Sequence, residues 1–469
     1  MNAAKATVLA AWLGGACLAG CGGGSSAPAD PRRPQVDQAV REKWGKGLDE
    51  MPTVELVVIS PHNENICNEF EWAFNLHHAV EHGRKVHVVW RDVGGGSTAV
   101  LRFLENRYKN GKGAEIDVVW GGGEVNFATM AAEGILQPME VSDGVLANVP
   151  ESFGGLSMYD PNRRWFGSAV SGFGFLYNRS LLKRANIPEP KRWEDLARPE
   201  FFSQICLADP TQSGSAAAAY EMIVQSAPSW PAGWARLLGI LGNGKRFVDS
   251  ASGAANAPVL GEAPIAACID FYGINRVREA PDVLVYVSPK GQTAFNADPI
   301  AILRNPPHPE LAQRFVDFVL SRRGQALWAL RVGERDGPIR SALGRQPIRR
   351  DVYAAYAGKL CPGIVNPYEG GGALELDRTM WQRRFGLLRK LVRAAAVDND
   401  EFLRAAKRKL IETNFDPKRL AEFHRLPDNV ATEAGIAEVA RKLNDETEAE
   451  KITTDWQRFF RERYKRVAE

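Results

Sequence analysis

Glycine- and hydroxyl-rich turns occur where strand patterns give way to helix patterns. Such turns suit anions, because glycine lets the backbone approach a ligand and free N–H groups at a helix start attract negative charge. In open α/β sheets, ligands bind beyond the carboxyl ends of strands, where these turns fall. The candidate ligand-binding residues in these turns are His62, Asn63, Gly95, Gly96, Ser97, Thr98, Gly122, Gly123, Thr211, Ser213, Gly214 and Ser215.

These turns also have a purely structural interpretation, in which the glycines make tight turns and the hydroxyls cap helices. One such turn would favour that interpretation. The sequence has them in equivalent positions, at 60–64, 94–98, 121–124 and 209–215. We therefore expect turns from two lobes to close on one ligand.

The motifs of common enzymes do not fit. The sequence has no complete GxxxxGK[ST] loop and no GxGxxG fingerprint, which disfavours nucleotide chemistry. No GxSxG elbow surrounds Ser171, Ser213 or Ser252, and the SxxK match at Ser180 and Lys183 lacks its partner motifs. We therefore predict that the protein is not an enzyme.

Five of the seven histidines lie between His62 and His87, which raises the question of a metal site. His78 and His82 are four residues apart and share a helix face. A third ligand at a spacing typical of zinc is missing, so we expect a solvated helix face and no resident cofactor.

Composition is that of a globular protein, with 45% hydrophobic and 25% charged residues in 469. The net charge of +3 disfavours a dedicated nucleic-acid surface, so no nucleic-acid partner is predicted. The cysteines beyond the first segment are widely spaced and form no CxxC pair; a disulfide between any two stays open. They are Cys67, Cys206, Cys268 and Cys361.

The first residues predict export. Lys5 precedes the apolar run 6–12, and small residues follow up to Cys21, a pattern that resembles the bacterial lipobox. We predict a signal peptide at 1–20 and acylation of Cys21, which would tie the protein to a membrane; ordinary secretion with a free thiol is the alternative. The Gly-, Ser- and Pro-rich segment 21–50 is predicted to be a flexible tether.

Beyond the tether, strand and helix patterns alternate, which predicts a parallel α/β sheet. Strands are expected at 54–60, 86–90, 116–120, 204–208, 246–249, 265–269, 284–287 and 300–303. Helices are expected at 64–81, 97–108, 124–133, 215–224, 254–260 and 309–321. The glycine-spaced aromatic run 172–178 is interpreted as a crossing between lobes. The predicted organisation is lobe one at 51–170, lobe two at 171–283, a return to lobe one at 284–334 and a helical extension at 335–469.

The extension carries apolar stripes in a charged, helix-favouring background, for example at Leu387, Leu391 and Trp456. We expect it to pack on lobe one, in preference to forming a separate interaction module.

Several segments occur in an order that resembles a known family. They include Asp117–Gly123, Glu133–Pro138, Gly172–Asn178, Asp209–Ser215 and Asp298–Leu303. Over about residues 54–330 the chain resembles the family 1 extracellular solute-binding proteins of the ferric-iron-type ABC transporters. The resemblance implies a two-lobed type II periplasmic binding protein fold (a Venus flytrap), a ligand at the hinge cleft, an ABC permease as partner, a periplasmic, lipid-anchored location and a monomer.

Ferric-binding relatives use a histidine after the first strand, a glutamate after the third and two adjacent tyrosines from lobe two. By resemblance, His62, Glu124 and Tyr272 are the candidate metal ligands. Phe271 replaces the other tyrosine, so Asp270 or a bound anion would have to compensate. Asp270 and Tyr272 thereby join the candidate ligand-binding residues.

Two functions follow as hypotheses. The first is a binding protein that captures a small anionic solute or ferric iron for import. The second is a structural or interaction lipoprotein that uses its helical tail to bind a partner.

Overall fold

The structure of the protein, a computed structural model, describes residues 30–111, 113–369 and 372–469. The predicted signal peptide, the acylation site at Cys21 and the first part of the predicted tether lie outside these residues. Within the described ranges, none of the helices is both long enough and apolar enough to cross a membrane.

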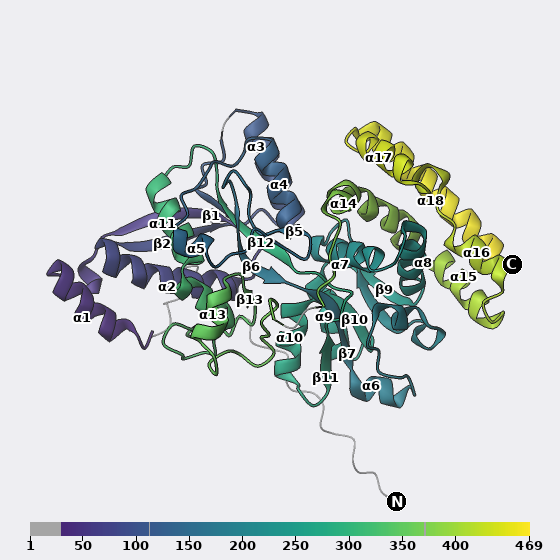
Figure 1. The fold of residues 1–469 in the computed structure, drawn as a ribbon, viewed down its shortest axis with the longest axis horizontal. Coiled ribbons are helices and arrows are strands. Elements are labelled where there is room, and N and C mark those ends of the chain that lie inside the picture. The colour runs from purple at the N-terminus through teal and green to yellow at the C-terminus, as the bar shows by residue number, and fades with distance from the viewer. Residues whose placement is uncertain (1–29, 112, 370–371) are drawn as a thin grey trace, which may run out of the picture.

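The described strands form the sheets of two lobes, which lie next to each other in Figure 1. The first sheet, in the order β13-β6-β12-β3-β1-β2, contains β1 (Thr53–Ile59), β2 (Lys85–Arg91), β3 (Val118–Trp120), β6 (Phe166–Ser171), β12 (Asn296–Ile302) and β13 (Gln346–Pro347). The second, in the order β11-β7-β10-β8-β9, contains β7 (Phe173–Asn178), β8 (Ile205–Ala208), β9 (Gly244–Val248), β10 (Ile265–Ile269) and β11 (Leu284–Val287). A hairpin of β4 (Ser152–Phe153) and β5 (Leu156–Ser157) is separate.

The predicted turns follow strands that pair in parallel. β1 is parallel to β2 and β3, and β8 is parallel to β9 and β10. In the first lobe the helices that follow are α2 (Glu64–His82), α3 (Ser97–Lys109) and α4 (Glu124–Ala132). In the second they are α7 (Gly214–Gln225), α9 (Ala251–Leu260) and α10 (Asp270–Glu279). The predicted alternation of strands and helices is confirmed.

An aromatic cluster fixes the end of β3 in the first lobe. Phe70 of α2 and Phe315 of α11 (Pro309–Leu320) contact Trp120 edge-on, with ring centroids 4.8 and 5.8 Å apart. Trp328 of α12 (Arg322–Ala329) lies 5.7 Å from Trp120. All four rings are buried, and burial of each contributes about 1.5–3 kcal/mol. The turn that leaves β3 therefore starts from a rigid point.

The chain changes sheets at Gly172, between β6 and β7. A Cβ at this position would lie 2.9 Å from the Phe295 ring, so only glycine fits without a shift. The return comes later than predicted: the segment 284–287 is β11, which pairs antiparallel with β7 in the second sheet. Its apolar pattern fits either sheet, and β12 is the strand that returns to the first.

The N-terminal segment corrects the predicted tether. Residues Arg33–Trp44 form α1, which packs on α2 through Val36 and Val40. The Trp44 Nε1–H donates to the Val80 carbonyl at 2.9 Å. Pro34 sits in the first turn of α1, where proline is tolerated because the N–H it lacks would have no helical partner. Proline had wrongly suggested that no helix could form there.

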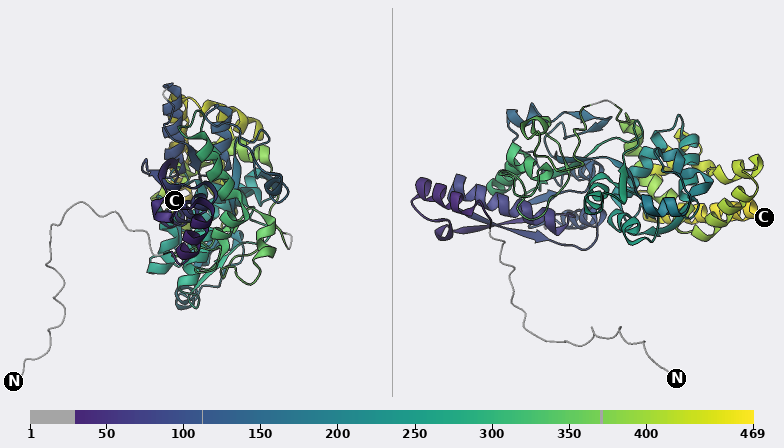
Figure 2. Two further views of the ribbon diagram at one scale, coloured as in Figure 1. Left: turned by 90° about the vertical axis from the view of Figure 1, so that its left-hand side faces the viewer. Right: turned by 90° about the horizontal axis from the view of Figure 1, so that it is seen from below.

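The C-terminal helices lie on the second lobe, so the predicted packing on lobe one is wrong. They are α14 (Arg378–Val392), the π-helical turn η4 (Arg393–Val397), α15 (Asp400–Glu412), α16 (Pro417–His424), α17 (Glu433–Lys442) and α18 (Glu446–Ala468). This C-terminal helical layer lies at the opposite end of the molecule from α1 (Figure 2). α14 packs on α7, and α16 packs on α8 (Trp230–Leu241). The sequence analysis missed α8, whose apolar face is the partner that the amphipathic stripes needed.

A buried ion pair fastens the layer: Arg384 of α14 meets Glu221 of α7 at 2.8 Å, and both side chains are buried. The segment before α14 belongs to the first lobe instead. β13 pairs with β6, and α13 (Arg350–Ala355) packs on α12. The helical extension therefore begins at Arg378 and not at residue 335.

Candidate ligand-binding cleft

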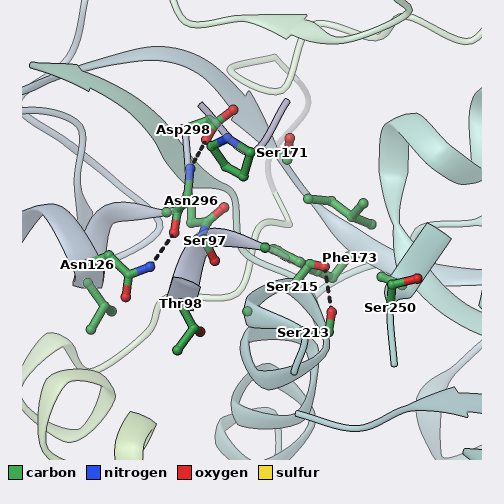
Figure 3. A pocket seen from close by; sticks show the side chains of 18 of the residues that line it. Ser97, Thr98, Asn126, Ser171, Phe173, Ser213, Ser215, Ser250, Asn296 and Asp298 are labelled. Carbon is green, nitrogen blue, oxygen red and sulfur yellow. Dashed lines mark hydrogen bonds between the residues drawn. The ribbon is translucent and has the colours of Figure 1, made fainter. Parts of the chain in front are cut away.

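A cavity of about 470 Å³ lies between the two sheets. The starts of α3 and α4 contribute Ser97 and Gly123 from the first lobe, and the starts of α7 and α9 contribute Gly214 and Ser250 from the second. Figure 3 shows Ser97 and Asn126 facing Ser213, Ser215 and Ser250 across it. The N-terminus of a helix carries the equivalent of about half a positive charge. The cavity therefore collects positive potential from both lobes without needing charged side chains.

Glycine brings the first-lobe turns together. Gly122 has a φ of 122°, and a Cβ there would lie 2.9 Å from the Ser97 Cβ. A side chain at Gly121 would meet the His62 ring at 2.8 Å. The first-lobe turns therefore pack at distances that only glycine allows.

The second lobe uses one serine arrangement twice. Ser213 caps α7 by accepting from the Ala216 N–H, and its Oγ lies 3.2 Å from that of Ser215. Ser250 caps α9 in the same way, with its Oγ 3.2 Å from that of Ser252. Because the hydroxyls also carry protons, the pairs supply donors beside two helix starts.

A buried charge pair of the first lobe forms one wall of the cavity. The Asp298 carboxylate accepts from Arg345 at 2.6 Å and from the Gly122 N–H at 2.9 Å, and it contacts His62 Nε2 at 2.7 Å. Burial would raise the pKa of Asp298, but the charge of Arg345 and the hydrogen bonds from Arg345 and His62 outweigh it and hold this pKa well below its usual range. Arg345 also lies over Phe271, 4.4 Å from the ring centroid. The charges of Arg345 and Asp298 cancel, so this part of the wall is close to neutral.

The C-terminal helical layer closes one side of the cavity. Trp381 and Phe385 of α14 line it, and the Trp381 Nε1–H donates to Glu124 Oε2 at 3.1 Å. Glu124 is 1% exposed, and its other oxygen has no partner in the described chain. Burial raises the pKa of Glu124 to about 7. At neutral pH this carboxyl is therefore only partly ionised.

Arg389 of α14 brings to the cavity a positive charge that has no ion-pair partner among the described residues. It donates to the Pro210 and Thr211 carbonyls of lobe two, at 2.7 and 2.9 Å, and to Thr98 Oγ1 of lobe one at 2.9 Å. All three acceptors are neutral. Burial lowers the pKa of this guanidinium, but from a value so high that the group stays charged. The lining carboxylate Asp249 is exposed to solvent, where its charge is screened.

Most of the predicted candidates meet at the cavity. Those that line it are His62, Gly95, Gly96, Ser97, Thr98, Gly122, Gly123, Glu124, Ser213, Gly214, Ser215 and Tyr272. Three others do not line it. Asn63 caps α2 by accepting from the Ile66 N–H, and Asp270 is buried, where its carboxylate accepts from the Gly172 N–H. Thr211 donates to Asp209 and faces a neighbouring cavity.

Other lining residues were missed by the sequence analysis. They include Asn126, Ser171, Ser250, Ser252, Asn296, Asp298, Arg345, Trp381, Phe385 and Arg389. Ser250 and Ser252 follow a strand and precede a helix, so the rule that found the other turns could have found them. Arg345 and Arg389 come from segments assigned to the extension, and no local pattern places them at the cleft.

The candidate metal ligands do not form a recognisable metal site. His62 is held by Asp298, and Glu124 by Trp381. In the described part of the chain, no group of three or more His, Cys, Asp and Glu side chains is placed to hold a metal ion. His78 is buried and bonds the Arg84 carbonyl at 2.7 Å, so the expected solvated helix face is wrong at that residue.

The cysteines of the described chain lie outside the cleft. Cys67, Cys206, Cys268 and Cys361 are buried and unpaired in the structure. None of them is among the residues that line the cavity.

Comparison with protein families and with curated proteins gives matches to part of the chain. Residues 116–333 match the family model described as bacterial extracellular solute-binding protein. The phosphoglycerate transport regulatory protein PgtC of Salmonella typhimurium is 32% identical over 161 residues, which are 34% of this chain and 40% of that protein. The match thus spans less than half of that relative's length.

Comparison with solved structures gives the fold. The periplasmic binding protein AfuA of Actinobacillus pleuropneumoniae, with fructose 6-phosphate bound, has a TM-score of 0.55 at 19% identity, covering 76% of this chain and 98% of AfuA. The ferric binding protein of Campylobacter jejuni has a TM-score of 0.52 at 18% identity, covering 70% of this chain and 96% of its own. The predicted type II, two-lobed periplasmic binding protein fold is confirmed. So is the predicted resemblance: over residues 116–333 the chain is similar to the bacterial extracellular solute-binding proteins.

Proposed function

We propose that the protein is an extracytoplasmic solute-binding protein that captures a small phosphorylated organic anion in the cleft and presents it to an ABC permease. One observation carries the proposal: helix starts from both lobes converge on one cavity, beside the uncompensated charge of Arg389. Each helix start stabilises an anion by about 0.3–1 kcal/mol, and more where it is partly buried. Closing the lobes on the ligand would add these contributions together.

The size and lining of the cavity agree with such a ligand. A volume of about 470 Å³ falls within the range of ordinary small-molecule sites. Phe173, Phe271 and Trp381 offer apolar surface to a carbon skeleton, while the serines and helix starts offer donors to a phosphate. Two of the similar proteins point to the same chemistry: AfuA holds fructose 6-phosphate, and PgtC is named for phosphoglycerate transport.

Ferric iron is the less favoured cargo. Fe(III) prefers several anionic oxygens. Glu124 has a pKa of about 7 because of its burial, and His62 is already engaged by Asp298. Phe271 stands where the second tyrosine would be. These features support an anion over the metal.

The rest of the proposal comes from the sequence. The protein would be a monomer, not an enzyme, and anchored to a membrane through an acylated Cys21. The alternative of a partner-binding tail is not favoured, because α14 lines the cleft through Trp381 and Phe385. The C-terminal helical layer therefore has a role that needs no partner protein.

Thermal unfolding with matched ligand pairs tests the proposal. The pairs are fructose 6-phosphate with fructose, 3-phosphoglycerate with glycerate, and ferric citrate with citrate. A ligand at 100 times its Kd stabilises the protein by about 2.7 kcal/mol, which raises Tm measurably. We expect a shift only with a phosphorylated member. Equal shifts within a pair, or a shift with ferric citrate alone, would overturn the proposal.

Serine variants locate the ligand. Ser213→Ala and Ser250→Ala each remove a cap hydroxyl that lines the cleft, and we expect them to reduce the ligand-induced shift. Ser229→Ala is the matched control, because Ser229 caps α8 in the same way but does not line the cavity. It should lower the Tm of the free protein and leave the ligand-induced shift unchanged.

A further inference from the structure

A second cavity, of about 490 Å³, adjoins the cleft on the side of the C-terminal helical layer. We call it the seam cavity, because its lining comes from the start of α3, from the turn at 211–212 and from α14, η4 and α18. It shares Gly95, Gly96, Thr98 and Gln212 with the cleft. The hydrogen bonds of Arg389 to Thr98 and to the Thr211 carbonyl lie where the two cavities meet.

Cations from separate parts of the molecule face this cavity. Arg102 comes from α3 of the first lobe, and Lys390 from α14. Neither forms an ion pair with any acidic side chain of the described chain, although side chains elsewhere form many. Arg393 also lines the cavity, but Asp209 and Asp398 contact it at 2.6 and 3.3 Å. Arg102 and Lys390 therefore carry the uncompensated charge.

These cations repel one another. The pKa of Lys390 is lowered by burial and then by the charges of Arg102 and Arg389. The pKa of Arg389 is likewise lowered by burial and by Arg102. Like charges held together without a counter-ion raise the free energy of the folded state, and an anion between them would relieve it. The repulsion agrees with the geometry: the exposed Arg102 and the half-buried Lys390 both line one cavity.

We propose that the seam cavity is a second anion site, which binds a phosphate group between Arg102 and Lys390. The start of α3 adds backbone donors at Gly96 and the positive end of its dipole. Gln212 and Thr98 supply further polar groups. A tetrahedral anion with several acceptor oxygens matches donors arriving from different sides. The site takes inorganic phosphate or the phosphate of a monoester, and it does not depend on the cleft having the proposed ligand.

Such a ligand would join parts that are far apart in the sequence. Arg102 moves with the first lobe, whereas Lys390 belongs to the layer that packs on the second. Phosphate at the seam would hold the first lobe against α14 and so favour the closed arrangement of the cleft. It would thereby raise the affinity of the cleft for its own ligand.

Equilibrium binding of inorganic phosphate to the purified full chain at low salt tests the site. The test variant is Arg102→Gln with Lys390→Gln. The matched control is Arg335→Gln with Lys451→Gln, which removes the same charges from exposed residues outside both cavities. The test variant loses charge-assisted hydrogen bonds to the phosphate. We therefore expect it to bind one phosphate fewer per protein molecule, or to bind that phosphate with a Kd at least about tenfold higher. The control should bind as the parent protein does.

The outcomes are separable from those of the cleft. If the cleft binds no phosphate, the test variant should lose all phosphate binding, and the inference would stand. A second arm uses fructose 6-phosphate in place of phosphate and shows whether the seam accepts a monoester. The inference is overturned if the parent protein binds no phosphate, if the test variant binds as the parent does, or if the control weakens binding equally. Circular dichroism of each variant shows whether the fold is kept.

Discussion

Glu124 provides a pH-dependent test of the cleft wall. Burial raises the pKa of its carboxyl from 4.5 to about 7 in the folded protein. The protonated form is therefore favoured by folding. Its contribution to stability is fully present below pH ~4.5 and is lost as pH rises through about 7.

The magnitude follows from the shift. Each pH unit of difference between the folded and unfolded pKa is worth about 1.4 kcal/mol, so the change from 4.5 to about 7 corresponds to roughly 3 kcal/mol. Glu124→Gln removes the ionisation but keeps a carbonyl oxygen that can accept from the Trp381 Nε1–H. The free energy of unfolding of the parent protein should therefore fall by about 3 kcal/mol, relative to the variant, between pH 4.5 and pH 8.

Urea unfolding at a series of pH values measures this difference. Other titrating groups act equally on both proteins, so subtracting one curve from the other isolates Glu124. If the two curves run parallel between pH 4.5 and 8, burial does not raise the pKa of this carboxyl and our description of the wall is wrong. A parent protein that gains stability relative to the variant as pH rises towards 4.5, with no change above it, would mean that Glu124 is ionised and paired, as a metal ligand would be.

Further predictions concern the layer, the cleft and its turns. Arg384→Met leaves the buried Glu221 without its charged partner and with Gln225 as its remaining donor, and should lower the free energy of unfolding by about 3–5 kcal/mol in urea titrations; a loss below about 1 kcal/mol would contradict a buried pair. Arg389→Gln should weaken binding of an anionic solute about tenfold and reduce its salt dependence, and equal affinities in calorimetry would refute its role. Gly122→Ala should cost about 1–3 kcal/mol, because its φ is 122° and a Cβ would meet Ser97 at 2.9 Å; an unchanged Tm would show that the turns can separate.

The turns could be predicted from the sequence because a parallel sheet brings the carboxyl ends of its strands to one edge. Apolar runs with the β1 pattern, followed by Gly-Gly-Gly or by Ser213-Gly-Ser215, therefore located most of the cavity. The same rule wrongly placed Asn63 and Thr211 at the cavity. Their side chains instead form a local helix cap and a local turn. Residues at the right turn can still point away from the cavity.

The remaining residues of the cleft could not be predicted, because they depend on contacts between segments that are distant in the sequence. Arg345 reaches the cleft because β13 joins the first sheet beside β6, a pairing of two residues that carries no local signal. Arg389 reaches it because α14 packs on α7 and not on the first lobe. An amphipathic stripe indicates that a helix packs on another element, but it does not identify that element. α1 was mistaken for a tether for a different reason, because Pro34 was taken to exclude a helix although proline is tolerated in a first helical turn.

The central claim is that the cleft binds a phosphorylated small molecule through helix starts of both lobes. Isothermal titration of the full chain with 3-phosphoglycerate, fructose 6-phosphate and their unphosphorylated counterparts tests it most directly. We predict that the cleft binds a phosphorylated solute at least about 100-fold more tightly than its counterpart, a difference of about 2.7 kcal/mol, and that Ser213→Ala with Ser250→Ala reduces this preference. Equal affinity within each pair, or a preference that loss of both serines leaves unchanged, would contradict the account.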